Sequence, residues 1–454
     1  MPVTHRFTVA LPRLAPLALG IALGLGSMSV ARAQSLNELY EAARSFDATY
    51  LAARALADSA QYRVEQAHAQ RRPNLGLTVS ATRGQSDIPS SDSTSRVEQA
   101  TLIGSQSLFN RANDKTIAQA DRSLEGAKAL LETAEQDLIV RVAQGYFDVL
   151  GAQDTLATAS ANKAAIAEQL ASAKRNFEVG TATITDTREA QARFDLATAQ
   201  EIAADNDLRT KRIAIDTLVG RNGVEPRPLA APVTLGPLLS GTVDTWVAPI
   251  DNAPPVRKAQ VDYDVAKLET EKARAQHLPV VDLNASYGRG HSSTDGTQIT
   301  PSPGPFNSTG GTTQSSIGVT LKVPLFTGFA TQNRVKETLL LEEQSRDTLE
   351  ATRRTVAQST RVAYFGVQSG QAQVKALEAA ESSSQLALEA TQLGYKVGVR
   401  VNLDVLNAQS QLFSTRRDLA KARYDVLVGS LKLRQAAGVL KPDDVQSVNQ
   451  LLSK

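Results

Sequence analysis

The sequence contains no cysteine and only two methionines among its 454 residues. Both methionines, Met1 and Met28, lie in the first 33 positions, so the rest of the chain contains no sulfur. Thiolate catalysis, cysteine–zinc sites, iron–sulfur clusters and disulfide bonds are therefore excluded.

An excess of charge of one sign is also missing. The chain has 49 Lys and Arg against 47 Asp and Glu, which gives a net charge of +2. Arg6, Arg13 and Arg32 lie in the first 33 residues, where no acidic residue occurs, so the remainder carries 2 − 3 = −1. A nucleic-acid-binding function is not expected, because such proteins carry an excess of basic residues.

Residues 1–33 have the pattern of a secretory signal peptide. Basic residues precede an apolar run over 14–30, and the small-residue ending at 31–33 predicts cleavage before Gln34. The alternative is a membrane-anchoring helix, which three glycines within the run disfavour. No cysteine follows the cleavage point, so an N-terminal lipid anchor is not expected, and no later stretch reaches about 18 consecutive apolar residues.

The sequence contains an internal repeat. Tyr146-Phe147 recurs as Tyr364-Phe365, and Phe177-Glu-Val-Gly180 recurs as Tyr395-Lys-Val-Gly398, both at a spacing of 218 residues. Upstream, the spacing grows from 206 to 217, which indicates an insertion within residues 291–314 of the second copy. The predicted segments are a signal peptide (1–33), a first repeat (34–220), a linker (221–245), a second repeat (246–440) and a C-terminal tail (441–454).

Each repeat contains one pair of alternating strands. The pairs are predicted over 75–83 and 97–108 in the first copy and over 280–290 and 315–325 in the second. Strands of roughly 9–11 residues with alternating polarity are typical of membrane-spanning β-strands. The polar connections 84–96 and 291–314 are expected as long outer loops. The alternative is a half-exposed hairpin of a soluble protein.

The remaining segments are predicted as long helices. No proline occurs between about Asn110 and Asn176, which allows a helix of roughly 67 residues, or about 100 Å. Apolar and small residues follow a 3,4 spacing both there and near the C-terminus, where the seam reads Val405, Ala408, Leu412, Thr415, Leu419, Ala422, Val426, Gly429 and Leu433. This pattern predicts closely packed coiled coils.

Four strands cannot close a barrel, and an open sheet edge leaves amide groups unsatisfied in hydrocarbon. Three chains supply twelve strands, which can form a barrel with an open interior. Two chains supply only eight strands, and side chains would fill the interior of a barrel of that size. The predicted fold is therefore an α+β membrane protein with two internal repeats. Its trimeric 12-stranded transmembrane β-barrel, with four strands per chain, continues into a long periplasmic α-helical coiled-coil barrel.

Several motifs are specific in combination, namely His277-Leu-Pro279, Leu325-Phe326-Thr-Gly328, the repeated Tyr-Phe and Val-Gly pairs, Ile184-Thr-Asp186 and Asp404-Val-Leu406. With them the whole mature chain resembles the TolC family of outer-membrane channels, which serve type I secretion and multidrug efflux. The resemblance implies a homotrimer in contact with outer-membrane lipid of a Gram-negative bacterium, with its helices in the periplasm. It would pass proteins or drugs outward from an inner-membrane ABC or RND-type transporter through a periplasmic adaptor (membrane fusion) protein. The missing lipid-anchor cysteine favours the secretion branch, but the cargo stays open.

The resemblance also assigns candidate site residues to the turns at 177–186 and 395–404. It implies a closed gate formed by Thr185 and Asp186 on one turn and by Tyr395 and Arg400 on the other. The residues themselves offer another role for Asp186, because Asp186-Thr-Arg-Glu189 fits a helix-capping box. The two roles are compatible.

Three further positions at these turns match the family. Asp404 is expected to form an acidic, cation-binding ring at the axis. Asn407 departs from the pattern of a second aspartate, so the constriction should be less negative. Gly180 and Gly398 match positions that contact the adaptor, although each also fits simple helix termination.

Nothing in the sequence indicates an enzyme, a cofactor or a metal site. His68, His277 and His291 lie on separate elements without metal-ligand spacing, and no phosphate loop or nucleophile elbow occurs. The main alternative function is a trimeric, membrane-anchored structural or adhesive coiled-coil protein, which would carry its strands in one C-terminal block. A stand-alone porin is a second alternative, which the long heptad helices disfavour.

Overall fold

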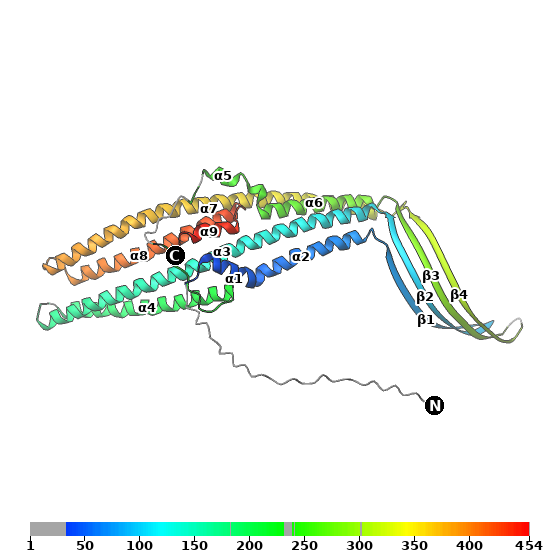
Figure 1. The fold of residues 1–454 in the computed structure, drawn as a ribbon, viewed down its shortest axis with the longest axis horizontal. Coiled ribbons are helices and arrows are strands. Elements are labelled where there is room, and N and C mark those ends of the chain that lie inside the picture. Colours follow the sequence, from blue (N-terminus) through cyan, green and yellow to red (C-terminus); the bar gives the residue numbers. More distant parts are fainter. Residues whose placement is uncertain (1–32, 182, 231–237, 240, 300–301, 454) are drawn as a thin grey trace, which may run out of the picture.

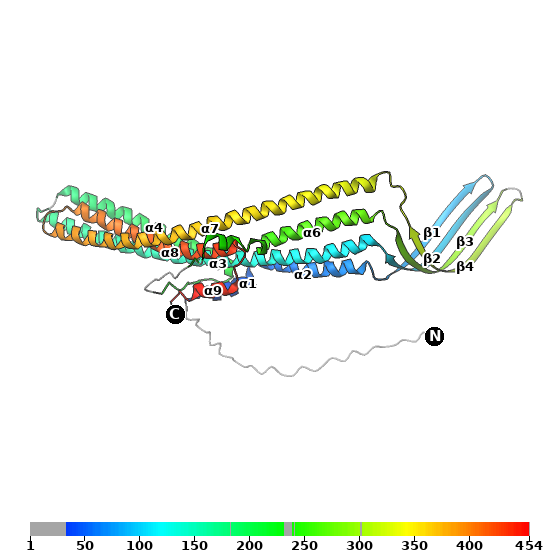
Figure 2. The ribbon, with the colours of Figure 1, turned by 90° about the horizontal axis from the view of Figure 1, so that it is seen from above.

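The computed structural model describes residues 33–181, 183–230, 238–239, 241–299 and 302–453. Apart from Ala33, the predicted signal peptide lies outside the described residues. The molecule is elongated, with a curved sheet at one end and long helices that extend away from it (Figures 1 and 2).

The two repeats contribute equally to one sheet. The strands are β1 (Asn74–Ile88), β2 (Ser91–Phe109), β3 (Val280–Gln298) and β4 (Gly304–Lys322). Their order is β1-β2-β3-β4, and all neighbours are antiparallel. The sheet joins the repeats through the β2–β3 pair.

The strands are longer than the sequence predicts. The described residues of the segments 84–96 and 291–314, expected as outer loops, mostly continue the strands, with a turn at 89–90 between β1 and β2. That expectation was wrong because it followed side-chain alternation, which fades where both faces of a sheet carry hydroxyl and glycine residues. The backbone ladder continues there regardless, since it pairs every N–H and C=O group along the hairpin.

The helices also follow the repeat. The first copy contains α1 (Leu36–Phe46), α2 (Ala48–Ala69), α3 (Arg111–Glu178) and α4 (Ile184–Val219). After the short α5 (Val243–Val247) and a 3-10 turn (Ile250–Asn252), the second copy contains α6 (Pro254–Ala275), α7 (Ala330–Lys396) and α8 (Asn402–Ala436). α3 has 68 residues, so it extends about 100 Å, as the absence of proline allows.

The predicted seam of α8 faces its neighbours. Val405, Leu412, Leu419, Val426 and Leu433 are all buried. α3 begins at the expected place because the Asn110 side chain accepts hydrogen bonds from the backbone N–H groups of residues 112 and 113. None of the helices in the described ranges is both long enough and apolar enough to cross a membrane.

The largest apolar core lies midway along the helices, where α1, α3, α4 and α8 meet. The repeated tyrosines fix the connecting segments there. The buried Tyr146 donates a hydrogen bond of 2.8 Å to the carbonyl of Arg227, and Tyr364 donates one of 3.2 Å to the carbonyl of Gly241. The predicted tail 441–454 contains a further helix, α9 (Pro442–Asn449), which adds Val445 and Val448 to this core.

Candidate functional site at the helical tip

The ends of α3 and α7 farthest from the sheet close with the same turn (Figure 1). Gly180 and Gly398 have φ of +78° and +80°, a left-handed conformation that glycine adopts without steric cost. The amides of Thr181 and Val399 donate back to the carbonyls of Asn176 and Gly394, at 2.8 and 2.9 Å. Each turn is therefore a Schellman motif, and helix termination accounts for both glycines.

Asp186 caps α4, but from a different position than the sequence predicts. The N-cap residue is Thr183, and Asp186 is the third helical residue of the capping box. The Oδ2 atom of Asp186 accepts from the backbone N–H of Thr183 at 2.9 Å and from its hydroxyl at 2.8 Å. The expected box from Asp186 to Glu189 is thus shifted by three residues towards the N-terminus. Both contacts use Oδ2, which leaves Oδ1 available to another donor.

Tyr395 and Arg400 lie on the α7–α8 turn, as predicted. Among the described residues of a single chain, Tyr395 meets Asn176 rather than Asp186, since Nδ2 of Asn176 donates to its Oη at 3.3 Å. The guanidinium of Arg400 lies 3.6 Å from the carboxylate of Asp404, one helical turn away. Thr185 lies exposed in the first turn of α4.

Asp404 lies in the first turn of α8, where a carboxylate interacts favourably with the helix dipole. Its neighbour Asn402 is buried, and the side-chain oxygen of Asn402 has no hydrogen-bond partner among the described residues. One turn further along α8, Oδ1 of Asn407 accepts a hydrogen bond of 3.1 Å from Arg193 on α4.

Sequence reasoning missed two polar links that join the helical hairpins near the tip, Asn176 to Tyr395 and Arg193 to Asn407. These links use positions at which the two repeats differ. At the spacing of 218 residues, Asn176 corresponds to 176 + 218 = 394, a glycine, and Asn407 corresponds to 407 − 218 = 189, a glutamate. The difference between the repeats marks both positions as candidates for such a contact, but it does not identify their partners.

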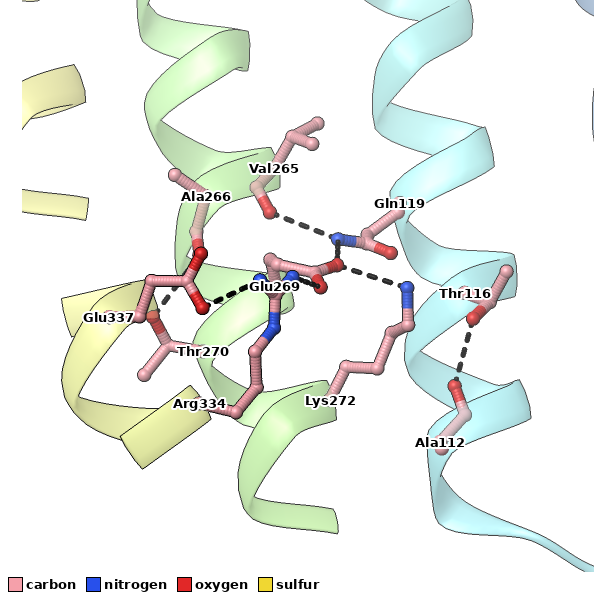
Figure 3. Close-up of polar contacts among 10 residues, drawn as sticks. All are labelled: Ala112, Thr116, Gln119, Val265, Ala266, Glu269, Thr270, Lys272, Arg334 and Glu337. Carbon is pink, nitrogen blue, oxygen red and sulfur yellow. Dashed lines mark hydrogen bonds and ion pairs between the residues drawn. The ribbon is translucent and has the colours of Figure 1, made fainter. Parts of the chain in front are cut away.

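A second polar cluster lies near the sheet, where α3, α6 and α7 come together (Figure 3). The carboxylate of Glu269 on α6 accepts from Gln119 on α3 at 2.9 Å, from Lys272 at 3.0 Å and from Arg334 on α7 at 2.9 Å. Burial raises the pKa of Glu269, but these hydrogen bonds outweigh it and lower the pKa to about 2. Glu269 therefore stays charged and holds the three helices together at the root of the sheet.

The model of the outer membrane efflux protein family matches residues 39–221 and 249–439. The chain belongs to the outer membrane efflux protein family. It is 34% identical to the outer membrane protein TolC of Vibrio cholerae over 441 residues, which covers 96% of this chain and 98% of the relative. It is 35% identical to the alkaline protease secretion protein AprF of Pseudomonas aeruginosa over 338 residues, which covers 74% of this chain and 67% of the relative.

A solved structure of the same fold extends this result. The CmeC outer membrane channel of Campylobacter jejuni superimposes with a TM-score of 0.75 at 15% identity and covers 98% of both chains. The predicted α+β channel fold is confirmed. As an outer membrane efflux protein, the chain is an outer-membrane exit duct for export, in a family of channels rather than of enzymes.

Proposed function

We propose that three copies of this chain form one duct. Their sheets would close a 12-stranded barrel in the outer membrane, and their helices would form a periplasmic tube that is shut at its tip until partners open it. The observation that carries this proposal is the pair of free sheet edges. Within the described residues of one chain, β1 pairs only with β2 and β4 only with β3, so both outer strands expose unpaired N–H and C=O groups. Such edges are compatible with hydrocarbon only if neighbouring copies pair with them.

The tip is the proposed gate. Thr185 and Asp186 on the α3–α4 turn would accept hydrogen bonds from Tyr395 and Arg400 on the α7–α8 turn of the same or an adjacent copy. The free Oδ1 of Asp186 and the mostly exposed guanidinium of Arg400 support this pairing, because both have capacity left for a partner. Three copies of Asp404 would form the acidic ring at the axis.

The turns are also the proposed contact for a periplasmic adaptor, with Gly180 and Gly398 at its centre. Val179, Val397 and Val399 flank the two glycines, and all three are exposed. Exposed apolar groups gathered at a protruding tip are typical of interaction sites. The adaptor would connect the duct to an inner-membrane transporter of the ABC or RND type, and the cargo would be proteins or drugs.

Single-channel recording in planar bilayers tests the gate. The double variant Tyr395→Phe with Arg400→Ser should conduct several-fold more than the parent, because it removes the donors that hold the turns together. The matched control is Tyr62→Phe with Arg54→Ser, which changes the same residue types on exposed positions of α2 and should conduct like the parent. If the gate variant and the parent conducted equally, the duct would be closed by residues other than those of these turns.

A membrane-anchored structural or adhesive coiled coil is the alternative function. It requires no conducting path, so purified protein should leave a bilayer silent under all conditions. The two strand pairs, one in each repeat, favour the duct, because an anchor needs only one block of strands.

A further inference from the structure

One face of the sheet is apolar along the half nearest the helices. On β1 this face carries Leu75, Leu77 and Val79, whose direct partners on β2 are Gly104, Leu102 and Ala100. The row of Leu75 and Gly104 continues through Ala285 on β3 and Ile317 on β4, and Leu283 and Val319 form the next row towards the helices. The three β1 side chains are exposed in the single chain. This is the face that a bilayer would cover.

On β3 the apolar side chains of this face end at a tyrosine. Tyr287 pairs with Leu102 on this face and is exposed, a position typical of an aromatic residue at the boundary between hydrocarbon and head groups. The next residue of β3 on the same face is Arg289, about 7 Å further from the helices. It pairs with Ala100, in the row of Val79, so it lies at the outer edge of the apolar band. The strands continue beyond Tyr287 in the direction away from the helices (Figure 1), so their side chains on this face would reach the head-group region.

Two more arginines lie further along this face. Arg83 on β1 is directly opposite Arg96 on β2, and both lie on the same face as Leu75 because Arg83 follows Leu75 by eight positions, an even number. All three arginines are exposed, and none forms an ion pair within the described residues. Like charges directly opposite each other on neighbouring strands are unfavourable without a counter-charge.

The acidic groups nearby do not neutralise the pair. Glu98 lies on the same face, two residues from Arg96, where its direct partners are Ala81 and His291. Asp295 accepts a hydrogen bond of 2.6 Å from Asn307. Over the three rows from Arg289 to the Arg83–Arg96 pair, three arginines accompany one glutamate, so the patch is positive.

We propose that Arg83, Arg96 and Arg289 bind the phosphate groups of a phosphorylated glycolipid in the outer leaflet, with its acyl chains on the apolar rows below. Guanidinium groups match phosphate in a bidentate geometry, and basic groups next to a bilayer surface recognise anionic head groups. A lipid fits better than a soluble anion because the patch continues directly into the apolar band. The proposal rests on the orientation of the duct, with the sheet in the outer membrane and the helices in the periplasm.

Binding to the purified trimer tests the proposal. Native mass spectrometry would compare bisphosphorylated lipid A, the same glycolipid without phosphates, and phosphatidylglycerol. The bisphosphorylated lipid should bind about tenfold more tightly than either, since charge-assisted hydrogen bonds of this kind are each worth about that factor. Equal affinity for the dephosphorylated lipid or for phosphatidylglycerol would overturn the proposal, as would complete displacement by excess inorganic phosphate.

Variants locate the site. Arg83→Gln with Arg96→Gln should reduce binding of the bisphosphorylated lipid about tenfold, whereas Arg83→Lys with Arg96→Lys should retain part of it. The matched control, Arg354→Gln with Arg361→Gln on α7, removes the same charge far from the sheet and should bind like the parent. If the Arg83→Gln with Arg96→Gln variant bound the bisphosphorylated lipid as tightly as the parent, the proposed site would be wrong. The same spectra report the trimer mass, so failure of the lipid site and failure of the trimeric duct give different results.

Discussion

Tyr424 on α8 donates a hydrogen bond of 2.6 Å to the carboxylate of Asp154 on α3, and this contact joins the two repeats midway along the helices. The Tyr424 ring also stacks on Phe147 of α3 at a centroid distance of 5.6 Å. Burial raises the pKa of Asp154, and the hydrogen bond from Tyr424 opposes this rise only in part. The link between α3 and α8 therefore includes a carboxylate whose charged form is disfavoured by its surroundings.

Replacement of this carboxylate should stabilise the protein at neutral pH. Because the pKa of Asp154 is raised in the folded state, its stabilising contribution is complete below its unfolded pKa and is lost as pH rises through the folded pKa. Asp154→Asn keeps an acceptor for Tyr424 and removes the charge. Its thermal midpoint in detergent should exceed that of the parent at neutral pH, and the difference should shrink under acidic conditions. A lower midpoint for the variant throughout would contradict this account.

Glu269 should show the opposite pH dependence. Its pKa is lowered from 4.5 to about 2, so its contribution to stability is complete above 4.5 and is lost as pH falls towards about 2. Glu269→Gln cannot attract Lys272 and Arg334 and should lower the thermal midpoint at neutral pH. The difference from the parent should diminish as the pH falls below 4.5.

Glu337→Gln is the control for this position. The Glu337 carboxylate is 56% exposed and pairs with the same arginine, Arg334, at 2.9 Å. Exposed ion pairs contribute little to stability, so this variant should melt close to the parent. If both variants lowered the thermal midpoint by a similar amount, the stability would depend on the ion pairs of Arg334 and not on the three-helix junction at Glu269.

Features set by periodicity could be predicted from the sequence. The repeat places Tyr146 and Tyr364 in equivalent roles, and the 3,4 spacing of α8 identifies residues such as Val405 and Leu433 that are buried. For the same reason, β1 and β3 begin within one residue of the predicted positions. Burial of one face imposes a regular spacing on side chains, and this spacing is visible in a single chain.

Features set by individual long-range contacts could not be predicted in this way. β1 and β3 end later, and β2 and β4 begin earlier, than expected, because backbone pairing rather than alternation carries the hairpins beyond the apolar rows. At the tip, Asn176 and Arg193 contact residues more than 200 positions away in the chain, and their counterparts in the other repeat differ. Neither periodicity nor internal repetition identifies such a partner, so the choice of Asp186 for Tyr395 stays a prediction about the assembled duct.

Assembly depends on the second strand pair. A chain that lacks 280–323 retains β1 and β2 but loses the strands that would meet the neighbouring copy, so it should neither form a trimer nor insert into membranes. Mass measurement in mild detergent, together with the β-sheet signal in circular dichroism, checks this expectation on the parent and the deletion variant. A folded parent monomer with its full sheet signal would exclude a barrel shared between copies.

The last prediction concerns multivalent cations at the periplasmic mouth. In the proposed trimer, three copies of Asp404 would place like charges near one axis, and a trivalent cation would relieve their repulsion while obstructing the path. Among the described residues of one chain, Asp404 pairs with Arg400 at a loose 3.6 Å, and the Arg400 side chain is 62% exposed, so it neutralises the carboxylate only weakly. Conductance should therefore fall when trivalent metal ions are added on the periplasmic side, and Asp404→Ala should abolish the block.

The control for this position is Asp425→Ala, which removes an exposed carboxylate that pairs with Lys421 further along α8 and should leave the block intact. Asn407 supplies no second ring of charge, so the cation is attracted by the single ring of Asp404 carboxylates. Dissolved salt screens this attraction, so raising the ionic strength should weaken the block steeply. If the Asp404→Ala channel were blocked like the parent, the cation site would have to lie at other carboxylates of the tube.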